Sequence, residues 1–398
     1  MHVMDIVERL EELRRSGLHR RMRLVDGPQG PTILLDGREV LLLCSNNYLG
    51  LAEHPEVREA AAEAAMRWGA GAGASRLISG NMHLHRELEE RLASFEGTGS
   101  ALLFGSGYLA NTGTIAALAG RGEVVFSDEL NHASIIDGCR LSRAERFVYR
   151  HCDMDHLAWG LRKAGDRAAL IVSDGVFSMD GDLAPLGELV ELGREHRCRL
   201  LVDEAHGTGA IGPGGRGAVA AAGLGGEVDV IVGTLGKALG SYGAYVCASA
   251  EIVELLINAA RPFIFSTGLP PPSVGAALAA LELIESSPER VERLRRNAAL
   301  MRSELREHGL ERPGSGTQIL PIVVGEAGTT MAMCERALER GVFVQAIRPP
   351  TVPEGTSRLR LTVMATHEEP ELRRAVRVLA DVARELGLSA DRPRLEAA

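Results

Sequence analysis

The chain has 398 residues and a formal net charge of −9, and this length predicts two or three structural units. The acidic balance argues against nucleic acid as a main partner, because a phosphate backbone requires a basic face. No apolar run approaches the roughly 18 residues of a membrane span, so none is predicted.

The cysteines are scattered and form no C-x-x-C pair, which argues against both a disulfide framework and a metal site. Reduced thiols in the cytoplasm are therefore expected. Residues 1–17 form an amphipathic pattern that lacks the apolar stretch of a signal peptide, which agrees with a cytoplasmic protein.

The first half of the chain predicts helices followed by a series of buried strands. Helices are expected over 54–68, which ends at the glycine-rich stretch 69–75, and over 83–96. Short, nearly continuous apolar runs then recur at intervals that fit crossover helices, at 101–104, 123–126, 169–172, 199–202 and 228–232. Such runs are typical of strands buried on both faces, so an α/β unit with a mostly parallel sheet is predicted.

The pattern changes after about residue 271. Long helices are predicted over 273–309, followed by strands at 319–325, 342–347 and 357–363 and a helix at 368–386. This indicates a smaller α+β domain. We expect an N-terminal segment 1–50, a large domain 51–285 and a small domain 286–398, with a disordered tail at 392–398.

The residues that follow each predicted strand are polar and reactive. Open α/β sheets bind ligands beyond the carboxyl ends of their strands, so these residues are candidates for a site. One of them, GSGYLA, nearly matches a dinucleotide fingerprint as Gly105-x-Gly107-x-x-Ala110, with Asp128 at the end of the next strand. A dinucleotide-dependent oxidoreductase is therefore an alternative, and a plain strand-to-helix turn is another.

A lysine and an acid at two strand ends favour a different cofactor. Asp203 ends the strand 199–202, and Lys237 lies 34 residues later, which is about the length of a strand–helix–strand unit. A pyridoxal ring needs an acid opposite its pyridinium nitrogen and a lysine at its aldehyde. His132 and His206 lie at further strand ends and could contact such a ring.

Six motifs together carry a resemblance that covers about residues 17–386: SNNYLGL (45–51), SGYLANTG (106–113), LNHAS (130–134), SDGVFSMDGD (173–182), VDEAHGTGAIG (202–212) and GTLGKALG (233–240). In this order and spacing they resemble the α-oxoamine synthase family of fold-type I pyridoxal-phosphate enzymes. The resemblance implies the aspartate aminotransferase-like fold, with a large domain around a mostly parallel sheet and a smaller α+β C-terminal domain.

The resemblance implies pyridoxal 5′-phosphate as cofactor and no metal. Lys237 would be the Schiff-base lysine and the acid/base at the substrate α-carbon, and Asp203 would pair with the pyridinium nitrogen. The other cofactor contacts would be His132, stacked on the ring, Ser178 and His206 at ring substituents, and Gly107, Tyr108 and Thr234 at the phosphate.

The resemblance also implies contacts to substrates and to a second subunit. Arg348 would bind the amino-acid carboxylate with help from Asn46, while His132, Arg20 and Thr351 would contact the substrates. Thr267 would reach the phosphate of a neighbouring subunit, in a homodimer with a shared active site.

The stretch 346–362 resembles the family branch that acts in biotin synthesis. That branch condenses L-alanine with pimeloyl-CoA or a pimeloyl acyl carrier protein. The alternative within the family is the branch that joins glycine to acetyl-CoA. A non-catalytic relative is also conceivable, but it would be expected to lack Lys237.

Overall fold

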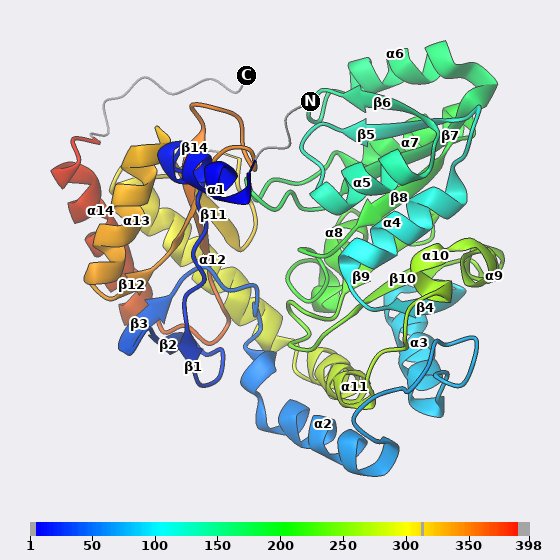
Figure 1. The fold of residues 1–398 in the computed structure, drawn as a ribbon, viewed down its shortest axis with the longest axis horizontal. Coiled ribbons are helices and arrows are strands. Elements are labelled where there is room, and N and C mark those ends of the chain that lie inside the picture. The colour runs from blue at the N-terminus through cyan, green and yellow to red at the C-terminus, as the bar shows by residue number, and fades with distance from the viewer. Residues whose placement is uncertain (1–4, 312–313, 389–398) are drawn as a thin grey trace.

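The structure is a computed structural model that describes residues 5–311 and 314–388. Figure 1 shows two lobes, with a twisted sheet and its helices in one and a smaller mixed unit in the other. The predicted tail at 392–398 and the first residues of the predicted N-terminal helix lie outside the described residues. The described part of that helix is α1 (Ile6–Arg15), which buries none of its side chains.

The large lobe is built on a seven-stranded sheet in the order β4-β10-β9-β8-β7-β5-β6. Its strands are mostly parallel, and only β10 runs antiparallel to both of its neighbours. This confirms the predicted fold class. The strands are β4 (Ser100–Phe104), β5 (Val124–Asp128), β6 (Glu145–Tyr149), β7 (Ala168–Asp174), β8 (Arg199–Asp203), β9 (Val230–Thr234) and β10 (Ala244–Ala248).

Five of these strands match the predicted apolar runs, whereas β6 and β10 were not predicted. β6 is an edge strand whose first side chains are exposed, so its sequence lacks a continuous apolar run. β10 is completely buried, but its short sequence AYVCA begins and ends in alanine and follows a glycine-rich stretch.

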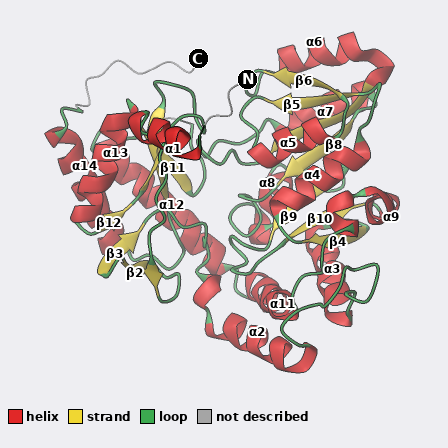
Figure 2. Ribbon diagram, viewed as in Figure 1, coloured by secondary structure: helices red, strands yellow, loops and turns green. Residues whose placement is uncertain are grey.

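The sheet is apolar on both faces because helices cover both of them (Figure 2). Neighbouring residues of one strand, such as Leu200 and Leu201, belong to two different hydrophobic clusters on opposite faces. The helices of this lobe are α2 (Pro55–Trp68), α3 (His83–Glu96), α4 (Gly107–Leu118), α5 (Ala133–Leu141), α6 (Met154–Ala164), α7 (Leu186–His196), α8 (Gly217–Ala221), α9 (Ala250–Ala259), α10 (Arg261–Ile264) and α11 (Pro271–Ser286).

The small lobe combines strands from both ends of the chain. β11 (Ile319–Gly325), β14 (Ser357–Thr362) and β13 (Gln345–Ile347) form an antiparallel sheet, and β1 (Val25–Asp26), β2 (Thr32–Leu35), β3 (Arg38–Leu42) and β12 (Val342–Phe343) form a second. The helices are α12 (Glu289–Glu307), α13 (Ala327–Glu339) and α14 (Glu369–Glu385). The proposed domain boundaries at 50 and 285 remain a prediction.

The single strand predicted over 342–347 is wrong in detail. Its first part, β12, pairs in parallel with β3, whereas its second part, β13, pairs with β14 in the other sheet. The chain therefore changes sheets at Val344, which is fully buried. An apolar run alone does not reveal such a switch, since both halves are apolar.

Two general properties of the chain follow from the described residues. Among them, no helix combines the length and apolar character needed to cross a membrane. All six cysteines are free thiols, and four of them are buried.

One buried carboxyl makes the stability of the large lobe dependent on pH. Glu96 accepts a hydrogen bond of 2.6 Å from the hydroxyl of Tyr245, and a longer one from Thr208. Burial raises the pKa of Glu96 to about 8, although the hydrogen bonds oppose this shift. Between the ordinary glutamate pKa and pH 8, the folded protein therefore holds a proton that the unfolded chain has released.

We expect the free energy of unfolding to fall as pH rises from about 5 to 8, by up to about 1.4 kcal/mol per pH unit from this group, and the effect to level off above pH 8. Glu96→Gln should reduce the slope, because its amide cannot ionise. The exposed Glu90→Gln is the control, and urea unfolding at several pH values is the measurement. Equal slopes for wild type and Glu96→Gln would show that Glu96 is already ionised in the folded state.

Candidate active site

The candidate site lies at the carboxyl edge of the large sheet. Asp174 ends β7 and Asp203 ends β8, and these two residues are direct partners in the strand register. β9 ends at Thr234, three residues before Lys237. The structure thus brings the predicted lysine and acid to adjacent strand ends.

Lys237 is held in a polar but desolvated environment. Its Nζ lies 2.8 Å from Nε2 of His206. Burial lowers the pKa of Lys237 to about 8 and outweighs the opposing effect of Asp203 and Asp174, while Arg360 lowers it further. An amine with this pKa is partly unprotonated near neutral pH, as a general base must be.

His206 is the first member of a hydrogen-bonded chain that leads away from Lys237. Its Nδ1 lies 2.6 Å from the hydroxyl of Tyr48, which donates to Oδ1 of Asn46 at 3.1 Å. Burial, together with the positive charge of Lys237, keeps the pKa of His206 well below its ordinary value. His206 is therefore neutral, with a proton on Nδ1 for Tyr48 and a lone pair on Nε2 for Lys237.

Asp203 is buried and firmly oriented. Oδ2 accepts a hydrogen bond of 2.6 Å from Nδ2 of Asn111, and Oδ1 accepts one of 2.8 Å from the backbone N–H of Ala205. Nδ2 of Asn111 also donates to Ser134. These hydrogen bonds fix the carboxyl group in an orientation in which it can face a protonated ring nitrogen.

His132 caps the N-terminus of α5 and presents an exposed imidazole. Its backbone N–H donates to Oδ2 of Asp174 at 2.7 Å, and its Nδ1 contacts Ser134 at 2.8 Å. Although His132 is exposed overall, partial burial of its ring lowers its pKa against the opposing effect of Asp203, and Lys237 lowers it further. A neutral aromatic ring with an open face is suited to stack on a heteroaromatic cofactor.

The residues predicted to bind the cofactor phosphate are less firmly oriented toward a common point than Asp203 and Lys237 are. Gly107 begins the twelve-residue helix α4, whose N-terminal N–H groups can bind an anion. Tyr108 is exposed and donates from its hydroxyl to Asp137 at 2.5 Å. Thr234 lies at the end of β9, where its hydroxyl donates to Gly243.

Ser178 lies at the turn of a hairpin, residues 176–183, which we call the Ser178 hairpin and whose ends meet in a bridge between Val176 and Leu183. Ser178 is buried, and its carbonyl accepts a hydrogen bond from Nε of Arg360. Arg360 comes from β14 of the small lobe, so this hairpin connects the two lobes.

Arg360 is the main residue that sequence reasoning missed. Its side chain is buried and also contacts Oδ1 of Asn46 at 3.3 Å. No carboxylate pairs with it among the described residues. The sequence SRLRLT of β14 alternates arginine with leucine, a pattern typical of a strand with one solvated face, so the pattern does not reveal that Arg360 is buried. Tyr48 and Asp174 were also missed.

The remaining predicted residues lie outside this cluster. Arg348 donates to the backbone carbonyls of Gly17 and His19 and not to a site residue. Arg20 is exposed in the same N-terminal segment, and Thr351 donates its N–H to the carbonyl of Arg348. Thr267 is exposed and pairs with Ser75 in an isolated bridge.

The dinucleotide alternative is not supported by the position of its acid. Asp128 is buried, and its carboxylate accepts from the N–H groups of Leu130 and Cys152 and contacts His151. Both of its carboxylate oxygens are therefore already engaged within the protein.

The residues present fit pyridoxal phosphate. They offer an oriented carboxylate at Asp203, an amine at Lys237, an open imidazole face at His132 and a helix N-terminus at Gly107. This combination is the donor set that the cofactor requires.

Comparison with known proteins agrees with this site. A model of the aminotransferase class I and II family matches residues 38–379. A relative from Geobacter sulfurreducens named 8-amino-7-oxononanoate synthase is 57% identical over 387 residues, covering 96% of this chain and 99% of the relative. A solved structure of SPT with PLP has a TM-score of 0.91 at 34% identity and covers 96% of this chain and 98% of that one.

A solved 8-amino-7-oxononanoate synthase from Francisella tularensis has a TM-score of 0.76 at 26% identity, covering 87% of this chain and 98% of that one. The family match and the near full-length relatives confirm the cofactor and the family that the motifs indicated. The chain therefore belongs to the aminotransferase class I and II family and, within it, to the 8-amino-7-oxononanoate synthases, which are pyridoxal-phosphate-dependent acyltransferases.

Proposed function

We propose that the chain condenses L-alanine with a pimeloyl thioester. A bond forms between the α-carbon of alanine and the thioester carbonyl, the carrier leaves as a thiol, and the amino-acid carboxylate leaves as CO₂. The observation that carries this proposal is the contact between Lys237 and His206 beside Asp203, in a chain 57% identical to a named 8-amino-7-oxononanoate synthase.

Proton transfer at the α-carbon is assigned to Lys237. When bound, pyridoxal phosphate supplies the electron sink that stabilises the negative charge left by removal of that proton. The lowered pKa of Lys237, about 8, lets its amine accept the proton and later return it. The neutral His206 can hold the lysine amine in place by a hydrogen bond, and its low pKa means that it does not take up the proton itself.

The cofactor would be held by residues from several strand ends. Asp203 would pair with the ring nitrogen, His132 would stack on the ring, and Ser178 and His206 would contact its substituents. Gly107, Tyr108 and Thr234 would bind the phosphate, for which the N-terminus of α4 is the strongest structural support.

Two arginines are candidates for the amino-acid carboxylate. Arg348 was favoured by the sequence, but its guanidinium is engaged by two backbone carbonyls. Arg360 is buried beside Asn46, which the hydrogen-bonded chain joins to Lys237 through Tyr48 and His206. We favour Arg360 for the carboxylate, while Arg20, Arg348 and Thr351 would contact the acyl substrate.

A homodimer with a shared site is part of this proposal. Thr267 is exposed, as are the large apolar side chains Leu77, Ile78 and Phe265 on the two segments joined by the Ser75–Thr267 bridge. A second copy of the chain would cover these side chains and receive Thr267 at its cofactor phosphate.

The substrate assignment is tested by comparing two substrate pairs on the purified holoenzyme. We expect turnover with L-alanine and pimeloyl-CoA, or the pimeloyl acyl carrier protein, to exceed turnover with glycine and acetyl-CoA. Release of free thiol and of CO₂ gives the rates. Faster reaction of the glycine pair would instead assign the chain to the glycine-using branch.

The role of Lys237 can be tested sharply because the chain contains only one other lysine, Lys163. Borohydride reduction of the holoenzyme should abolish its visible absorption and fix the cofactor on Lys237, as peptide mass spectrometry would show. Lys237→Ala should bind the cofactor reversibly and lose at least about 100-fold in turnover, the usual size of an acid–base contribution. Lys163→Ala is the control, and label on Lys163 alone would contradict the assignment.

The two arginines are separated by matched substitutions. Arg360→Lys should raise the KM for L-alanine by about tenfold or more, because the planar two-pronged guanidinium is lost. Arg348→Lys should leave that KM nearly unchanged and affect the acyl substrate instead. Steady-state kinetics with each substrate varied in turn gives both values, and the opposite pattern would restore Arg348 as the carboxylate ligand.

A further inference from the structure

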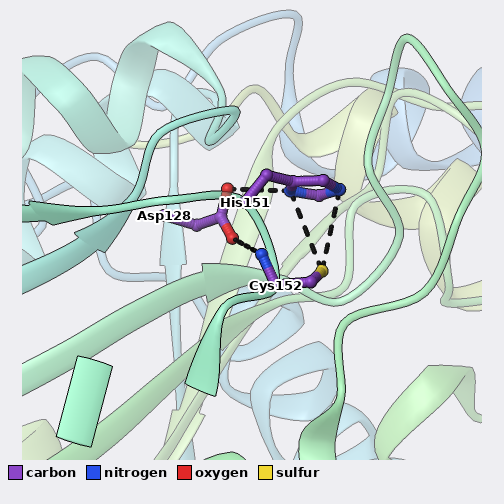
Figure 3. Close-up of side chains that lie close together, drawn as sticks. All are labelled: Asp128, His151 and Cys152. Atoms are coloured by element: carbon purple, nitrogen blue, oxygen red, sulfur yellow. Dashed lines mark hydrogen bonds and ion pairs between the residues drawn. The ribbon is translucent and has the colours of Figure 1, made fainter. Parts of the chain in front are cut away.

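A second group of titratable side chains lies outside the cofactor cluster and contacts the Ser178 hairpin. Figure 3 shows Asp128 at the end of β5 together with His151 and Cys152, which follow β6. Nδ1 of His151 lies 3.0 Å from Asp128, and Nε2 lies 2.8 Å from the carboxylate of Asp182 in the hairpin.

The ligand atoms of Asp128, His151 and Cys152 are close enough to suggest a metal site, lying within 4.8 Å of one another. The hydrogen bonds argue against this, because each ring nitrogen already faces a carboxylate. Sγ of Cys152 lies 3.8 and 3.6 Å from the two nitrogens, so it sits against the ring and not on the axis of either lone pair.

The imidazole is therefore best described as a cation between two carboxylates. Burial alone would lower the pKa of His151, but the hydrogen bonds to Asp128 and Asp182 raise it to about 12. Both ring nitrogens then carry protons and donate. The imidazolium of His151 thus bridges the carboxylates of Asp128 and Asp182 and provides a positive charge between them.

The cation holds the Ser178 hairpin at its base. Asp182 accepts the backbone N–H of Phe177 through its own carbonyl at 3.0 Å, which closes the hairpin. The ring of Phe177 also packs edge-to-face against His151, with centroids 4.5 Å apart. Asp182 and Phe177 are both close in sequence to Ser178. A displacement of His151 would therefore also displace Ser178.

The small lobe holds the same hairpin from the opposite side. Arg358 pairs with Asp180, the hydroxyl of Thr317 donates to the carbonyl of Gly181 at 2.9 Å, and Arg360 donates to the carbonyl of Ser178. The hairpin is thus fixed between His151 in the large lobe and three side chains of the small lobe.

We propose that His151 is a positioning residue: held by Asp128, it fixes Asp182 and thereby the hairpin that presents Ser178 to the cofactor and the Ser178 carbonyl to Arg360. The effect on the amino-acid substrate rests on the role proposed above for Arg360, and the effect on the cofactor rests on the contact proposed above for Ser178. His151 itself touches neither the proposed substrate residues nor Lys237.

The test is His151→Gln, whose amide can replace one hydrogen bond but not the charge. We expect the visible circular dichroism of the bound cofactor to change, because Ser178 moves relative to the ring. We also expect the KM for L-alanine to rise about tenfold with a smaller fall in kcat, because a displaced Ser178 carbonyl would no longer hold Arg360 in place to bind the substrate carboxylate. The exposed His308→Gln, at the end of α12, is the control.

A second variant separates positioning from folding. Asp182→Asn removes the facing charge, so His151→Gln combined with Asp182→Asn should be less impaired than the sum of the two single effects. A lower thermal midpoint with unchanged dichroism and unchanged KM would overturn the proposal and leave His151 a purely structural group. If the wild-type protein did not use L-alanine, the proposed function would be wrong. The visible circular dichroism of the bound cofactor, compared between wild type and His151→Gln, would still test the role of His151.

Discussion

The active site depends on burying a lysine amine among groups that nearly balance its charge. Removing Lys237 from water disfavours its ammonium form, and the carboxylates of Asp203 and Asp174 offset only part of that cost. Arg360 adds a second positive charge nearby, so a protonated His206 would be strongly disfavoured. The neutral histidine and the lowered lysine pKa are consequences of one electrostatic balance.

The same balance explains why the site needs the small lobe. Side chains alternate along β14, so Arg358 and Arg360 project to one side while Leu359 and Leu361 pack in the core on the other. The two arginines meet Asp180 and the Ser178 carbonyl, both in the large lobe. Ionic and hydrogen-bonding contacts therefore connect the lobes around the hairpin, in addition to a hydrophobic cluster that contains residues of both lobes.

Much of this arrangement could be predicted from the sequence because strand ends in a parallel sheet converge. The apolar runs located five of the seven strands, and the residues after them placed Lys237, Asp203, His132 and His206 at one edge. The edge strand β6 was missed because its side chains are partly solvated. Arg360 was missed because an alternating strand does not reveal which of its faces is buried against a second lobe. Tyr48 was missed because its role depends on contact with His206, a residue 158 positions away.

The pairing of β3 with β12 has a consequence for synthesis of the protein. The N–H of Thr362 also donates to the carbonyl of Leu43. Strand β3 and the residues that follow it therefore form part of their backbone hydrogen bonds with residues near the end of the chain. The large sheet, made from residues 100–248, can form while later residues are still on the ribosome. Arg360 can reach Asn46 only after β14 has emerged. With the role proposed above for Arg360, the nascent chain would hold a cofactor-binding edge well before it could hold the amino-acid substrate.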